Sequence, residues 1–166
     1  MLRNAPPPVC LVVGTSGGGK TTLVEKLVAE LTSRGFTVAT AKGHKEPILL
    51  DRPGKDTWRH RRAGAAMTFL VAGSETTAFI DRDLSSDPDK LTLLCPPGID
   101  LLLAEGFKTH TGRPKIAVSP VEVDPTDPNL LCIADDSGKE WAGVLRFGRD
   151  EVGRLADLIV ARVMGR

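Results

Sequence analysis

The sequence lacks any apolar run close to the roughly 20 residues that a helix needs to cross a bilayer. Its first eight residues hold three prolines and no hydrophobic stretch of signal-peptide length, so we interpret residues 1–8 as a short, loose tail. These two absences predict a cytoplasmic protein that has no membrane partner.

No sign of charge dominates the chain as a whole. The 22 Lys and Arg against 21 Asp and Glu give a net charge of +1, which argues against nucleic acid as the main partner. The exception is segment 42–62, where seven basic residues stand against three acidic ones. Such a cluster is either a solvated face or a surface that attracts an anionic ligand. Its basic members are Lys42, Lys45, Arg52, Lys55, Arg59, Arg61 and Arg62.

Cysteine is scarce, and the C-x-x-C spacing is absent. Cys10, Cys95 and Cys132 are odd in number, and two of them fall in apolar, strand-like runs. This pattern predicts three free, mostly buried thiols in a reducing compartment.

At 166 residues the chain has the length of one domain, which we expect to span residues 1–166. Apolar strand-like runs alternate with helical patterns, which is typical of an α/β protein with a mostly parallel sheet. We expect Asp56 to cap the second helix and Gly35 to end the first. The predicted strands are 9–13, 36–41, 67–71, 76–80, 101–104, 115–118 and 130–133; the helices are 20–33, 57–66, 87–94 and about 152–163.

Between the first strand and the first helix lies Gly14-Thr15-Ser16-Gly17-Gly18-Gly19-Lys20-Thr21, which satisfies G-x-x-x-x-G-K-[ST]. Glycines let successive backbone N–H groups surround phosphate oxygens, and the helix that follows points its positive end at the same anion. Lys20 then neutralises charge between the β- and γ-phosphates, and the Thr21 hydroxyl is placed to bind Mg²⁺. The alternative is a flexible glycine turn, but the flanking strand and helix favour a three-layer P-loop NTPase fold.

The apolar strand at 101–104 is followed by Glu105. A carboxylate at the carboxyl end of a buried strand faces the crevice where α/β sheets bind ligands. Glu105 is therefore the candidate that holds Mg²⁺ or orients a water, whereas Asp100 belongs to the opposite end of that strand.

Two further segments go beyond a general nucleotide site. Leu50-Asp51-Arg52-Pro53-Gly54-Lys55-Asp56-Thr57 precedes Arg62-Ala63-Gly64-Ala65-Ala66. With the P-loop and Glu105-Gly106-Phe107-Lys108, they resemble, in the same order, the motifs of the MobB family, molybdopterin-guanine dinucleotide biosynthesis protein B. The resemblance covers about Val9 to Val118.

That resemblance implies a cytoplasmic, usually dimeric GTP-binding adapter with weak GTPase activity. It would assist a MobA-type molybdenum cofactor guanylyltransferase, which joins GMP to molybdopterin. The resemblance places GTP and Mg²⁺ on the P-loop and Thr22. It gives Asp51 a switch-like position near the γ-phosphate. Asp51 and Glu105 are then the expected catalytic residues and, with Thr21, the expected metal ligands. Arg52, Lys55, Arg59 and Arg62 would line a surface for the phosphate of molybdopterin or for the partner enzyme, unless they form a solvated helix face.

The sequence differs from expected motifs at two places, and these differences limit which residue roles the resemblance implies. The family often has K-H-x-H-H after its second strand, whereas this chain reads Lys42-Gly43-His44-Lys45-Glu46, which leaves Lys42 and His44 as candidates there. The N-K-x-D tetrad that reads guanine in many GTPases is absent, so guanine preference rests on the resemblance. Asp135 or Asp136 is a candidate for the missing carboxylate.

Two other functions remain open. A P-loop small-molecule kinase would need an arginine-bearing lid. The Arg59–Arg62 cluster resembles one, but it lies early in the chain and no separate acceptor site is apparent. A nucleotide-dependent metallochaperone would need Cys or His at ligand spacing, whereas His44, His60 and His110 are scattered.

Overall fold

The computed structural model describes residues 5–44, 46–84, 87–118, 124–141 and 143–166. Residues 1–4 of the predicted tail and Lys45 of the basic cluster lie outside these ranges. The chain forms two compact units, one made of Met1–Gly43 with Ser85–Arg166 and the other of His44–Leu84. That the whole chain folds as one domain stays a prediction.

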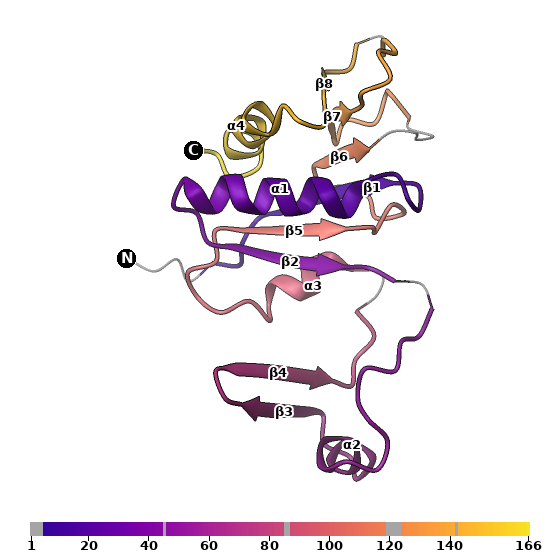
Figure 1. Cartoon of the computed structure of the whole chain (residues 1–166), viewed down its shortest axis with the longest axis vertical. Coiled ribbons are helices and arrows are strands. Elements are labelled where there is room, and N and C mark those ends of the chain that lie inside the picture. The colour runs from indigo at the N-terminus through magenta and orange to yellow at the C-terminus, as the bar shows by residue number, and fades with distance from the viewer. Residues whose placement is uncertain (1–4, 45, 85–86, 119–123, 142) are drawn as a thin grey trace. The chain divides into compact units, whose positions relative to one another are not determined.

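The first unit is built on a six-stranded sheet in the order β2-β5-β1-β6-β7-β8. Every strand pair in it is parallel, which confirms the predicted α/β fold with a parallel sheet. All carboxyl ends therefore meet at one edge, as Figure 1 shows for the arrows of β2 and β5. The strands are β1 (Val9–Gly14), β2 (Val38–Lys42), β5 (Leu101–Glu105), β6 (Lys115–Val118), β7 (Leu130–Ala134) and β8 (Arg146–Phe147).

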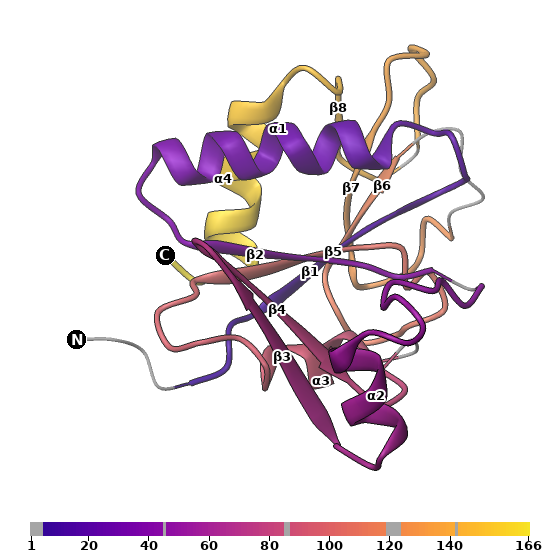
Figure 2. The ribbon, with the colours of Figure 1, turned by 60° about the horizontal axis from the view of Figure 1, so that its bottom comes forward.

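Helices cover both faces of this sheet. One face packs against α1 (Lys20–Ser33) and α4 (Val152–Arg162), whose apolar stripes join alternate residues of β1 and β5 in the larger core cluster. The other face packs against α3 (Pro88–Thr92) through Leu91. Figure 2 shows α1 and α4 on one side of the strands and α3 on the other. Because β1 and β5 are covered on both sides, they read as continuous apolar runs.

The end of α1 follows from its sequence. Gly35 adopts a φ of +87°, a left-handed conformation that glycine tolerates best. Its N–H donates to Thr32 O, and the Phe36 N–H donates to Leu31 O. This is the Schellman arrangement, which satisfies the last carbonyls of the helix and confirms the predicted cap at Gly35.

The second unit contains α2 (Asp56–Arg62) and a hairpin of β3 (Met67–Ala72) with β4 (Glu75–Ile80), paired antiparallel. Two details of α2 were predicted wrongly. Lys55 holds the N-cap position, and Asp56 is the first helical residue. The helix stops at Arg62 rather than Ala66, because Gly64 turns into the left-handed region with a φ of +107°.

Other differences lie at strand ends. The second strand begins at Val38 rather than Phe36, and the two-residue strand β8 was not predicted. Pro7 is buried and Pro8 O accepts a hydrogen bond from Leu102 N, so the end of the predicted loose tail is packed against the sheet. All three cysteines are free, and Cys10 and Cys132 are buried, as predicted. No helix among the described residues is long and apolar enough to span a membrane.

Candidate functional site

The loop between β1 and α1 has the conformation that a phosphate cradle needs. Gly17 and Gly19 adopt φ values of +72° and +88°, where a side chain would strain the backbone. The Gly18 N–H donates to Thr15 O at 3.2 Å and closes a turn within the loop. Gly19 holds the N-cap position of α1. The first N–H groups of a helix lack partners within it, so they are available to an anion here.

Lys20 folds back over the loop that precedes it. Its ammonium donates a hydrogen bond to Thr15 O at 2.6 Å. The positive charge is thereby held against the cradle, on a flexible stem that can move from a carbonyl to a phosphate oxygen.

Thr21 and Glu105 come together although 84 positions separate them. The Thr21 Oγ1 lies 3.0 Å from Oε1 and 2.9 Å from Oε2 of Glu105. The register explains the contact, because Glu105 lies opposite Val12 at the end of the strand beside β1. Glu105 is only 8% exposed, so its carboxylate lies at the floor of the site.

Lys42 completes this cluster from the neighbouring strand β2. It lies opposite Glu105 in the β2–β5 register. Its ammonium is 3.4 Å from Glu105 Oε1 and 3.4 Å from Thr21 Oγ1. Of the altered K-H-x-H-H segment, Lys42 therefore reaches the site. The ring of His44 instead hydrogen-bonds the backbone of Glu46.

Close backbone packing fixes Glu105. The Gly43 N–H donates to Glu105 O at 2.9 Å. A Cβ on Gly106 would lie 3.2 Å from Gly43 O, and one on Gly43 would lie 3.1 Å from the Phe107 ring. Phe107 has a φ of +53°, which is uncommon outside glycine. Both glycines let the ends of β2 and β5 approach each other directly behind the carboxylate.

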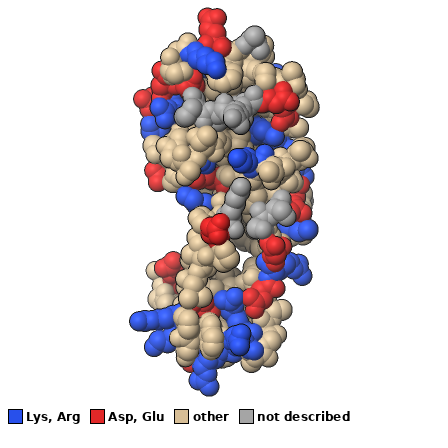
Figure 3. Space-filling model, turned by 90° about the vertical axis from the view of Figure 1, so that its right-hand side faces the viewer, with Lys and Arg blue, Asp and Glu red and all other residues tan. Residues whose placement is uncertain are grey.

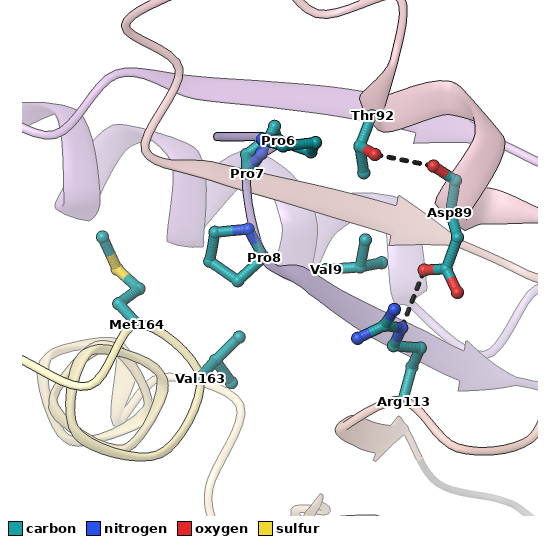
Figure 4. A pocket seen from close by; sticks show the side chains of 9 residues that line it. All are labelled: Pro6, Pro7, Pro8, Val9, Asp89, Thr92, Arg113, Val163 and Met164. Atoms are coloured by element: carbon teal, nitrogen blue, oxygen red, sulfur yellow. Dashed lines mark hydrogen bonds and ion pairs between the residues drawn. The ribbon is translucent and has the colours of Figure 1, made fainter. Parts of the chain in front are cut away.

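A groove of about 660 Å³ opens beside this cluster, between α1 and the edge strand β2. Thr21, Lys42 and Glu105 form its polar end. Val24, Val28, Ala29 and Ala41 provide apolar lining. A second cavity, of about 340 Å³, lies at the start of β1. Arg113 donates to Asp89 there at 2.7 Å, and Figure 4 shows both side chains among those that line the cavity.

Asp51, the second predicted catalytic and metal-binding acid, belongs to the other unit. Its carboxylate accepts from Thr57 Oγ1 at 2.8 Å and pairs with Arg61 Nη1 at 3.3 Å. Arg61 also donates to Asp81 at 2.7 Å, and its hydrogen bonds to the two carboxylates, the one to Asp81 first, raise the pKa of its guanidinium. Asp51 thus organises its own unit, and its role toward a nucleotide stays a prediction.

Asp100 lies at the far end of β5, as expected. Its carboxylate accepts hydrogen bonds from Thr37 N–H and from Arg166. In the part of the chain that the structure describes, no group of three or more His, Cys, Asp or Glu side chains is placed to hold a metal ion.

One residue near the cradle was missed. Arg149, in the turn after β8, comes so close to Gly19 that a Cβ there would lie 2.9 Å from its Nη1. No sequence pattern predicts this contact, because the strand that positions Arg149, β8, has only two residues and gives no periodic signal.

Comparison with known proteins places these features in a family. The family model described as "MobB: Molybdopterin guanine dinucleotide synthesis protein B" matches residues 9–136. The chain belongs to the MobB family. The match extends the resemblance seen in the sequence past Val118 to Asp136, two residues beyond β7.

Relatives and solved structures agree with this assignment. The molybdopterin-guanine dinucleotide biosynthesis adapter protein of Escherichia coli is 35% identical over 164 residues, covering 92% of this chain and 91% of that protein. The adapter protein of the same description from Haemophilus influenzae is 33% identical over 136 residues, covering 78% and 73%. The crystal structure of Bacillus subtilis MobB superimposes with a TM-score of 0.70 at 26% identity, covering 96% of this chain and 99% of that one. The chain is thus a P-loop nucleotide-binding protein of this family.

Proposed function

We propose that the chain is a cytoplasmic GTP-binding adapter with weak GTPase activity in the synthesis of molybdopterin guanine dinucleotide. In this role it assists a MobA-type molybdenum cofactor guanylyltransferase to attach GMP to molybdopterin. The observation that carries the proposal is the convergence of Thr21, Glu105 and Lys42 on the phosphate cradle of a MobB-family chain.

The side chains suit a nucleoside triphosphate with Mg²⁺. The loop amides and Lys20 bind phosphate oxygens, and Thr21 and Glu105 present hydroxyl and carboxylate oxygens within 3.0 Å of each other. Such hard oxygen ligands are the ones that Mg²⁺ prefers. When bound, Mg²⁺ would neutralise charge on the phosphates.

Weak hydrolysis follows from how Glu105 is held. Both carboxylate oxygens contact Thr21, and one pairs with Lys42. A strong general base needs a carboxylate that can reach a water and take its proton. Since Thr21 and Lys42 hold the carboxylate of Glu105 in place, it is less free to move to a water than an unpaired carboxylate would be, although it keeps acceptor positions for a metal ion.

The basic surface formed by α2 and the loop before it supports binding of an anionic partner or of the molybdopterin phosphate. Arg52, Lys55, Arg59 and Arg62 are exposed, and Figure 3 shows Lys and Arg gathered on the part of the molecule that contains α2. Exposed arginines suit phosphate recognition, because their donors form a planar fork. The double variant Arg59→Ala, Arg62→Ala should weaken stimulation of the partner and leave GTP affinity unchanged. Unchanged stimulation would reduce these arginines to a solvated face.

The homodimer is supported by the hairpin of the second unit. Met67, Phe69 and Val71 lie on one face of β3, and Phe69 and Val71 are 60% and 70% exposed. A two-stranded hairpin is marginally stable alone, so burial of this face by a second copy would stabilise it. Sedimentation should give a dimer for the unaltered chain and a monomer for Phe69→Ser with Val71→Ser; an unaltered chain that is monomeric at all concentrations would contradict the dimer.

The function is tested by adding the chain to a MobA-type guanylyltransferase with molybdopterin, GTP and Mg²⁺, and following formation of the dinucleotide. We expect faster formation with the chain than with an equal amount of an unrelated protein. No acceleration, together with rapid phosphorylation of a small molecule from ATP, would favour a kinase and overturn the adapter proposal.

A further inference from the structure

The carboxyl ends of β7 and β8 lie on the same edge of the sheet as the phosphate cradle. The order β1-β6-β7-β8 is parallel throughout, so β7 and β8 end on the same edge as β1. In Figure 1 the loop between β1 and α1 lies on the side of the molecule to which the arrow of β6 points. Ligands of open α/β sheets bind along this edge, so a nucleotide held by its phosphates at β1 would lie on the same edge as the end of β7.

Arg149 connects this region to the cradle. Its Nη1 would lie 2.9 Å from a Cβ on Gly19, the last glycine of the cradle. The next residue, Asp150, pairs with Lys26 of α1 at 2.5 Å. The Arg149 guanidinium therefore lies beside the cradle, whereas the Lys26–Asp150 pair is an exposed contact farther along α1.

Asp136, which follows β7, is held by the same arginine. Its Oδ1 accepts from the Arg149 backbone N–H at 2.8 Å, and its Oδ2 accepts from Nε at 2.5 Å. One guanidinium group therefore separates the carboxylate of Asp136 from the phosphate cradle. These hydrogen bonds, that from the backbone first, lower the pKa of Asp136, so the carboxylate is ionised at neutral pH.

The carboxylate still has capacity for a ligand. A carboxylate offers about four acceptor positions, and Arg149 uses one on each oxygen. Asp136 is exposed, whereas the preceding Asp135 is 2% exposed and binds Ser137 N–H and Oγ. Of the two acids, Asp136 is the one that a ligand can reach.

We propose that Asp136, positioned by Arg149, reads the base of the bound nucleotide and selects guanine through the adjacent N1–H and N2–H donors of that base. The inference rests on the proposed function in requiring that GTP binds at the cradle. Adenine has an acceptor at N1 and no amino group at C2, so it cannot make this pair of hydrogen bonds to a carboxylate. The site would thus supply the carboxylate that the missing N-K-x-D tetrad provides elsewhere.

The variant Asp136→Asn tests the assignment, because it should gain affinity for one nucleotide, XTP, as it loses affinity for GTP. Asparagine can accept from N1–H and donate to a carbonyl, which matches xanthine, whose C2 carries oxygen in place of the amino group. Binding of GTP and XTP to the full chain with Mg²⁺ is measured by calorimetry. We expect GTP affinity to fall and XTP affinity to rise, so that their ratio changes by about tenfold to hundredfold, as for a bidentate pair with a base.

Asp150→Asn is the matched control, because it removes the same charge from an exposed side chain in the adjoining turn. It should leave the GTP to XTP ratio unchanged. An unchanged ratio in Asp136→Asn, or an equal loss of both nucleotides, would overturn base reading by Asp136 while leaving the proposed function intact. Failure of the unaltered chain to bind GTP would overturn the proposed function and this inference with it.

Discussion

The hydroxyl of Thr21 lies within 3.0 Å of both carboxylate oxygens of Glu105, and this contact joins the first turn of α1 to the end of β5. In the proposed complex both groups would help to hold Mg²⁺. The variant Glu105→Gln keeps the shape of the side chain and removes its charge. We expect it to lower the apparent affinity for Mg²⁺ by about 10- to 100-fold, the range typical of lost metal-supporting groups.

The measurement is a GTP titration repeated over a series of Mg²⁺ concentrations. Glu25→Gln is the control, since Glu25 is an exposed carboxylate on α1, the helix that contains Thr21. It should follow the unaltered chain. If Glu105→Gln shows the same Mg²⁺ dependence as Glu25→Gln, Glu105 does not support the metal.

Gly35 should be costly to replace although its surroundings are open. A Cβ there meets nothing within 4 Å, but the φ of +87° strains any other residue. We expect Gly35→Ala to lower the free energy of unfolding by about 1 kcal/mol without changing nucleotide affinity. Denaturant unfolding measures the change. Gly153→Ala is the control, because Gly153 lies in α4 and its Cβ would make only ordinary contacts; equal stability of the two variants would contradict the cap.

The three thiols should differ in reactivity. Burial raises the pKa of Cys132 to about 12 and also raises that of Cys10, whereas Cys95 is only partly buried. With a thiol reagent at pH 8 we expect Cys95 to react first, and all three cysteines to react once the chain is unfolded. Cys95→Ser should lose the early reaction. Rapid labelling of Cys10 or Cys132 in the folded chain would show that the sheet opens easily.

Stability should depend on pH through Asp127. The ammonium of the buried Lys115 lies 2.7 Å from its carboxylate, and this hydrogen bond, followed by that from Asn129 N–H, lowers the pKa of Asp127. A lowered folded-state pKa adds stability above the ordinary pKa near 3.9, and this stability is lost as the pH falls through the folded-state value. Asp127→Asn should therefore be less stable than the unaltered chain at pH 7, with the gap closing below about pH 4. A gap that does not change with pH would contradict the ion pair.

Much of the first unit was predictable because its signals are local. The apolar run before Gly14 and the stripe on α1 specify a strand and a helix, and G-x-x-x-x-G-K-T specifies the turn between them. Glu105 was singled out because a carboxylate at the carboxyl end of a buried strand faces the crevice where α/β sheets bind ligands. In each case the sequence segment carries the physical cause of the structure within about ten residues.

The remainder depends on contacts between distant segments. Lys42 meets Glu105 only because β2 and β5 are neighbours in the sheet. Arg149 comes close to Gly19 only because β8 pairs with β7 as the last strand of the same sheet. The cap at Lys55 was missed because Asp56 is of a residue type that often caps helices. In the structure Asp56 lies in the first turn of α2, where its negative charge interacts favourably with the helix dipole.

The most direct test of the account is the binding of GTP by the unaltered chain and by Lys20→Ala, measured by calorimetry with Mg²⁺ present. Lys90→Ala, an exposed lysine on α3, is the control for loss of a positive charge. We predict binding by the unaltered chain and by Lys90→Ala, and none detectable by a folded Lys20→Ala. Equal GTP binding by Lys20→Ala would contradict the phosphate cradle on which the whole account depends.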